Sequence, residues 1–120
     1  MKLNSAKVKA FTKDLEKAYY MPVYVNPTLL VFMADTDNPS LILTETKLVI
    51  LPGDSRPFTK PLLKAINKLS TKYKVIEAIS HYEYACDVFV EFKRDGIRLK
   101  HSWSGYDYDD EPSGPLELEL

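Results

Sequence analysis

The sequence is poor in the residues that build disulfides, metal sites and phosphate-binding loops. Its 120 residues include one cysteine, two histidines and four glycines. Cys86 has no second cysteine for an internal disulfide, and with His81 and His101 it forms neither a CxxC nor an HExxH pattern. The glycines are too far apart for a dinucleotide-binding or Walker loop. We therefore expect no metal, no cofactor and no nucleotide hydrolysis.

Long apolar runs and secretion signals are also missing. The opening segment MKLNSAKVKAF lacks the apolar core of a signal peptide, and no stretch approaches the roughly 18 apolar residues of a membrane span. Both Asn-x-Ser/Thr triplets, at Asn26 and Asn38, have proline in the middle, which prevents glycosylation. These absences predict a cytoplasmic protein with no membrane partner.

What is present indicates one ordinary globular domain. Hydrophobic residues make up 45% of the chain and charged residues 28%. Six of the seventeen acidic residues follow residue 105 with no base among them, which leaves eleven acids against sixteen bases before it. We expect a basic single domain over residues 1–105 and an acidic C-terminal tail, interrupted by proline and glycine, over residues 106–120.

The clearest local signal is a β-hairpin over residues 82–104, closed by Asp95-Gly96. An Asp-Gly pair suits a type I′ turn, whose two central residues need a positive φ. That turn places Phe92 opposite Leu99 and Lys93 opposite Arg98. One face of the hairpin is then apolar and should lie on the core, and the other is polar. The apolar face carries Tyr82, Tyr84, Cys86, Val88, Val90, Phe92, Ile97, Leu99, His101 and Trp103, and the polar face carries Glu83, Asp87, Glu91, Lys93, Arg98, Lys100 and Ser102 with Phe89.

Hydrophobic spacing predicts two helices. Apolar residues recur every three or four positions from Asn4 to Tyr19, where Asn4 or Ser5 is the candidate N-cap. A second helix should follow Thr59 as its cap, with Pro61 in the first turn.

Strands are expected at 29–34 and 75–79, the latter ending in a bend at Ser80-His81. Residues 41–51 form either one strand or a hairpin broken at 45–47. The last five residues have the alternation of a strand that adds to a sheet edge of this domain or of a partner. Together these elements predict an α+β fold, with two helices packed on one face of a mostly antiparallel sheet of about five strands.

The most distinctive charge pattern lies between Ser55 and Ile76, where no acid occurs. Four of its bases are spaced by four residues, so on a helix they form one stripe. Like charges at this spacing repel, and a stripe of one sign is typical of a surface that meets phosphates or an acidic protein. The alternative is a solvated face with no partner. The candidate partner-binding residues are Arg56, Lys60, Lys64, Lys68, Lys72 and Lys74.

The tail supplies a second candidate contact region. Its residues Tyr106, Asp107, Tyr108, Asp109, Asp110 and Glu111 combine acids and aromatics. Alternate carboxylates can bind Ca²⁺, but the spacing of an EF-hand loop is absent, so a solvated tail is the preferred interpretation.

Cys86 is not expected to be a nucleophile. In the predicted hairpin register, His101 lies about 13 Å along the strand from Cys86, too far for proton transfer. A buried thiol and a hydrogen-bonded histidine explain both residues. We expect no catalytic residue and no enzymatic activity.

Two functions fit this sequence. The first is a non-enzymatic binding module, such as an inhibitor or regulator, that docks a protein with an acidic surface through the lysine stripe and the tail. The alternative is binding of single-stranded nucleic acid, with Phe89, Tyr106 and Tyr108 stacking on bases and the tail competing for the basic groove. The tail resembles in composition the acidic, apolar-ended tails of single-stranded-DNA-binding proteins, whereas the helical start departs from their all-β barrels.

Overall fold

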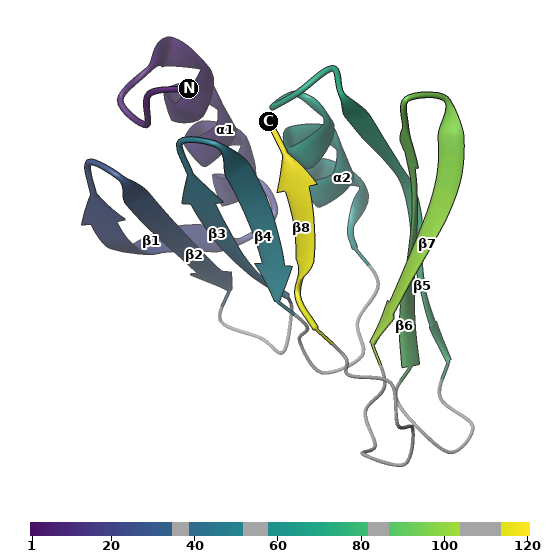
Figure 1. Cartoon of the computed structure of the whole chain (residues 1–120). Coiled ribbons are helices and arrows are strands. Elements are labelled where there is room, and N and C mark those ends of the chain that lie inside the picture. Colours follow the sequence, from purple (N-terminus) through teal and green to yellow (C-terminus); the bar gives the residue numbers. More distant parts are fainter. Residues whose placement is uncertain (35–38, 52–57, 82–86, 104–113) are drawn as a thin grey trace.

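A computed structural model describes residues 1–34, 39–51, 58–81, 87–103 and 114–120. For residues 77–81, 87–89 and 102–103 it describes only the backbone. It contains two helices and eight strands within these ranges (Figure 1). In chain order they are α1 (Ala6–Glu16), β1 (Tyr20–Asn26), β2 (Leu29–Ala34), β3 (Ser40–Thr44), β4 (Lys47–Leu51), α2 (Lys60–Asn67), β5 (Tyr73–His81), β6 (Asp87–Arg94), β7 (Ile97–Trp103) and β8 (Leu116–Glu119).

Five strands form an antiparallel sheet, here sheet A, in the order β1-β2-β3-β4-β8. Alternation along β2, β3 and β4 buries every second residue, as the period of a strand requires. β8 pairs with β4, and its Leu116 and Leu118 are buried opposite Ile50 and Leu48. The last residues therefore add to the sheet edge of this domain and not to that of a partner.

The other three strands form sheet B, in the order β5-β6-β7. Asp95 and Gly96 have φ angles of 54° and 77°, the positive values that the predicted turn requires. The register of β6 and β7 is the predicted one, with Phe92 opposite Leu99 and Lys93 opposite Arg98. The turn and the register of the hairpin are confirmed for the part that the structure describes, whereas the predicted burial of Ile97 is wrong, because this residue is exposed.

Each helix begins at the expected cap. The Ser5 hydroxyl accepts a hydrogen bond from the Val8 N–H at 3.3 Å, and the Thr59 hydroxyl accepts one from the Leu62 N–H at 3.4 Å. The helices lie side by side behind sheet A (Figure 1). The core contains Val8, Phe11 and Leu15 of α1, Leu62, Ala65 and Ile66 of α2, and the inward residues of both sheets. The α+β prediction is confirmed.

Phe11 shows how the helix layer contacts the sheet. Its ring meets that of Phe32 edge-on, with centroids 5.6 Å apart. Both side chains are almost fully buried, so α1 is fixed against the centre of β2.

The strand count is higher than predicted, and the strands divide between two sheets. Residues 41–51 contribute a hairpin, because Glu45 and Thr46 connect β3 to β4. β1 was not predicted, since Pro22 suggested only the end of a helix. The predicted bend at Ser80-His81 is wrong, because these residues pair with Val88 and Asp87 and the β5–β6 ladder continues through them.

Three features of the sequence lie outside the described residues. They are Arg56, Cys86 and the acidic segment 106–111. Within the described ranges, no helix is long and apolar enough to cross a membrane.

Candidate binding surface

The predicted lysine stripe is shorter in the structure than in the sequence. α2 ends at Asn67, and Lys68 is its C-cap. Lys72 therefore lies in the connection to β5 and Lys74 in β5 itself, so the spacing of four places only Lys60, Lys64 and Lys68 along the helix. Leu69 and Tyr73 are buried beyond the end of the helix, and the Tyr73 hydroxyl donates to the Ile66 carbonyl at 3.3 Å.

Two of the stripe's lysines already have partners within the chain. The Lys68 ammonium lies 3.1 Å from the Asp14 carboxylate of α1. The Lys72 ammonium donates to the carbonyl oxygen of Leu120 at 3.0 Å. Both contacts are at the surface, where an ion pair contributes at most about 1 kcal/mol. Lys60 and Lys64 are exposed.

Lys74 belongs to a different group of charges, on the outer face of sheet B. It lies directly opposite Lys93 of β6, and Lys93 lies directly opposite Arg98 of β7. Three cations therefore form a row across three neighbouring strands, and all three side chains are exposed. Like charges directly opposite one another destabilise a sheet, so folding alone does not favour this row.

One acid on this face partly offsets the repulsion between the cations of the row. Arg98 donates from Nε at 3.0 Å and from Nη2 at 2.6 Å to a single oxygen of Glu91. Glu91 also lies directly opposite Lys100, whose side chain points to the same outer face. Among the side chains placed on this face, one acid thus accompanies four bases.

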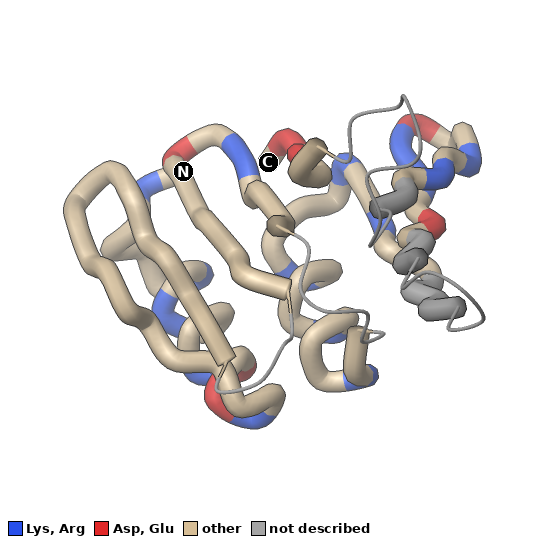
Figure 2. Tube along the Cα trace, turned by 90° about the horizontal axis from the view of Figure 1, so that it is seen from below, with Lys and Arg blue, Asp and Glu red and all other residues tan. Residues whose placement is uncertain are grey.

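The first residues of β5 and the β6–β7 turn enclose a shallow recess of about 250 Å³. We call it the lysine recess. It is lined by Thr71, Lys72, Tyr73, Lys74, Lys93, Asp95 and Gly96. Three lysines and one acid, Asp95, thus line one concavity, and the excess of positive charge favours an anionic group there. Figure 2 shows basic residues gathered on the β6–β7 hairpin and the neighbouring chain.

Tyr73 holds this part of the molecule in place. Its ring is buried beneath the recess, and burial raises the pKa of its hydroxyl above the ordinary value of 10.0. Because side chains alternate along a strand, a buried Tyr73 directs Lys74 outward. The start of β5 is further fixed by Asn67, whose side chain exchanges two hydrogen bonds with the backbone of Val75, at 2.9 and 2.8 Å.

We define the cationic surface as Lys72, Lys74, Lys93, Arg98 and Lys100. The charge pattern of the sequence predicted the first two as partner-binding residues, and the hairpin placed the other three only on a polar face. The missing signal was the pairing of β5 with β6, which joins residues far apart in the chain. The hairpin turn had already placed Lys93 opposite Arg98, so a prediction of that second pairing would have completed the row.

The other residues considered for chemistry are structural or not described. The ring of His101 lies between β7 and the segment before β8, with Nε2 2.9 Å from the Gly114 carbonyl oxygen. In the part of the chain that the structure describes, no three His, Cys, Asp or Glu side chains gather in a group that could bind a metal ion.

Comparisons with known proteins found no match for this chain among protein-family models, curated proteins or solved structures.

Proposed function

We propose that this protein is a small non-enzymatic binding module, an inhibitor or regulator that docks the acidic surface of a partner protein through its cationic surface. The observation that carries the proposal is the row Lys74, Lys93 and Arg98. A row of like charges raises the energy of the free protein, and a partner that supplies carboxylates removes this repulsion on binding.

An apolar residue beside the row supports a protein partner. Ile97 follows the turn and is 61% exposed, although the alternation of the hairpin predicted it in the core. It is exposed because β7 is an edge strand and Ile97 lies at the turn, beyond the helices. Protein interfaces combine an apolar centre with a polar rim. Alternation along β7 places Ile97 on the face opposite Arg98, so Ile97 adds an apolar contact at the edge of the cationic surface and not at its centre.

Single-stranded nucleic acid is the other partner that the sequence suggested. Its recognition relies on aromatic side chains that stack on bases within a basic groove. The aromatic side chains that the sequence offered for stacking, those of Phe89, Tyr106 and Tyr108, lie outside the described part of the chain. The most exposed tyrosines that the structure does describe are Tyr19, which precedes β1, and Tyr24, which belongs to it. Sheet B lies on the opposite side of the molecule (Figure 1), so these tyrosines do not border the cationic surface.

We further propose a cytoplasmic location. The support is the single cysteine, since proteins of oxidising compartments with this size generally rely on disulfides.

The test compares two double variants of equal charge. Lys74→Glu with Lys93→Glu reverses the centre of the cationic surface, and Lys60→Glu with Lys64→Glu makes the same change on α2. All four lysines are exposed, so both variants should keep the thermal midpoint of the parent. Each variant is used for affinity capture from native lysate, with and without nuclease, and captured proteins are identified by mass spectrometry.

We expect one or more proteins to be captured by the parent and by the α2 variant, to survive nuclease treatment and to be lost with the sheet B variant. Raising the salt from 50 to 200 mM should weaken capture only modestly, because a protein interface has fewer counterions to release than a nucleic acid. Equal capture by both variants would refute the site, and loss of capture on nuclease treatment would replace the protein partner by nucleic acid.

A further inference from the structure

One of the four edge strands differs from the others in charge. The edge strands of sheet A are β1 and β8, and those of sheet B are β5 and β7. Lys74 and Glu77 lie on β5, Arg98 and Lys100 on β7, and Glu117 and Glu119 on β8. Charged residues on an edge strand prevent pairing with another chain. β1, whose sequence is YMPVYVN, has none.

β1 also exposes apolar side chains over most of its length. Met21, Val23, Tyr24 and Val25 are each at least half exposed, and Val25 reaches 72%. Met21 pairs with Met33 and Tyr24 with Val31 on the outer face, whereas Val25 pairs with Leu30 on the core face. A strand that is apolar on both faces has the composition of a central strand, yet among the described strands β1 pairs only with β2.

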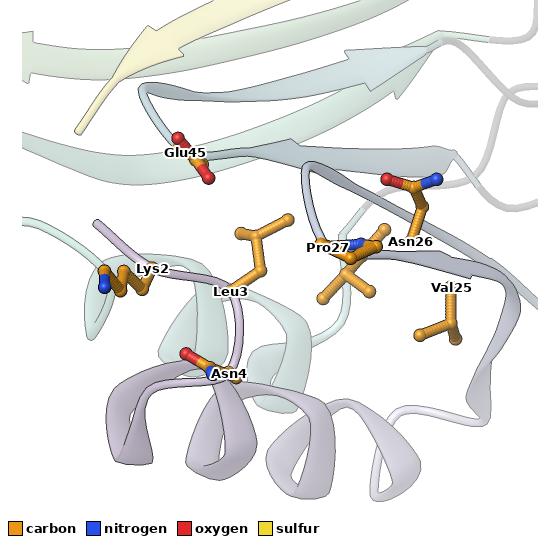
Figure 3. A pocket seen from close by; sticks show the side chains of 8 residues that line it. Lys2, Leu3, Asn4, Val25, Asn26, Pro27 and Glu45 are labelled. Atoms are coloured by element: carbon orange, nitrogen blue, oxygen red, sulfur yellow. The ribbon is translucent and has the colours of Figure 1, made fainter.

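A groove adjoins the inner face of β1. It comprises two hollows, of about 440 and 270 Å³, which share Leu3, Val25 and Leu30 as lining residues. Figure 3 shows Leu3, Val25 and Pro27 around the larger hollow, between the segment that leads into α1 and the β1–β2 hairpin. Its charged lining residues are Lys2, Lys9 and Glu45, and most of the others are apolar, so the groove suits an apolar side chain.

We propose that β1 pairs antiparallel with β1 of a second copy of this chain, which joins two five-stranded sheets into one continuous sheet. The pairing involves Tyr24, Val25 and Asn26, because the register shift between Pro22 and Tyr24 interrupts the first half of the strand. In this dimer the apolar side chains of each β1 adjoin the groove of the other copy.

Charge selects a second copy as the occupant. An uncharged strand pairs with itself without repulsion, whereas the cationic β7 repels its own copy and the acidic β8 does the same. Pairing of β8 with β7 would be attractive, but it joins two different surfaces and leads to open chains. Pairing of β1 with β1 uses the same surface twice and closes at two copies.

This inference goes beyond the proposed function and does not rest on it. β1 and sheet B lie on opposite sides of the molecule (Figure 1), and β1 and β2 themselves hold no charged residue. The dimer therefore leaves both cationic surfaces open, at its two outer ends.

The test is the mass in solution, measured by sedimentation equilibrium between about 1 and 100 µM. The variant is Val25→Lys, which adds a charge at an exposed edge position. The control is Ile97→Lys, the same change on β7 at a similarly exposed apolar residue. The parent and the control should reach twice the chain mass of 13.8 kDa, and Val25→Lys should raise the dissociation constant by about 100-fold or more, because both copies bury an unpaired charge.

Amide hydrogen exchange distinguishes this pairing from other dimers. In the parent, the amides within residues 24–26 that point away from β2 should become protected as concentration rises, and in Val25→Lys they should not. A parent that stays at 13.8 kDa over the whole range would overturn the proposal. So would a dimer that survives Val25→Lys, or one in which these amides exchange equally fast at all concentrations.

Discussion

Replacing Leu118 by alanine tests whether β8 is an integral part of the core. Leu118 is 2% exposed and lies opposite Leu48, which is fully buried. Truncation of a buried leucine to alanine costs about 2–5 kcal/mol, because transfer free energy is lost and a cavity remains. Since β8 is an edge strand that can relax into the gap, we expect about 3 kcal/mol.

The expected shift of the thermal midpoint follows from this loss of free energy and from the unfolding entropy, which depends on chain length. A domain of 120 residues has an unfolding entropy of about 0.25 kcal/mol/K, so each kcal/mol lowers the thermal midpoint by about 4 °C. Leu118→Ala should therefore lower the midpoint by about 12 °C and reduce the urea midpoint in proportion.

The matched control is Glu117→Ala, one residue away on the outer face. Glu117 is half exposed and lies 3.4 Å from the Lys47 ammonium. Its loss should cost less than about 1 kcal/mol, as for other surface ion pairs. Equal midpoints for Leu118→Ala and Glu117→Ala would show that β8 does not pack on the core, and the β4–β8 pairing would then be wrong.

Two further predictions concern the turn and a buried tyrosine. Gly96→Ala should lower the free energy of unfolding in urea by about 1 kcal/mol, because φ at Gly96 is +77°, although no atom lies within 4 Å of an added Cβ. The control Gly114→Ala has equal space and no positive φ, so it should be nearly neutral. Equal costs for the two variants would contradict the type I′ turn. Burial raises the pKa of Tyr73 in the folded state above its value of 10.0 in the unfolded chain, so stability is complete below pH 10 and falls as the pH rises beyond it. Tyr73→Phe should flatten the decline of the urea midpoint between pH 9 and 11, and an unchanged decline would show that the hydroxyl is not buried.

The elements that the sequence predicted are those set by neighbouring residues. Asp95-Gly96 fixes a turn, and the turn fixes the register of the strands beside it. Thr59 caps α2 because its hydroxyl reaches an N–H three residues on. Each of these signals spans a few residues, so no knowledge of the rest of the chain was needed.

The features that were missed depend on distant pairing. β1 has apolar residues on both faces and therefore lacks the alternation by which a half-buried strand is identified. Ser80 and His81 favour a bend locally, but pairing with β6 satisfies their backbone groups and extends the strand. Only two of the five residues of the cationic surface were predicted as binding residues, for the same reason: the β5–β6 register that aligns Lys74 with Lys93 cannot be obtained from local spacing.

The pairing of β4 with β8 also sets the order in which this chain can fold. Lys47 meets Glu119 and Ile50 meets Leu116, so sheet A is completed only after α2 and all of sheet B have been synthesised. Until then the edge of β4 is unpaired and its Leu48 and Ile50 lack the cover of β8. Such long-range contacts are formed late and slow the folding of a domain. The nascent chain thus carries an open apolar edge from the synthesis of β4 until that of β8, and exposed apolar surface of this kind is what chaperones bind.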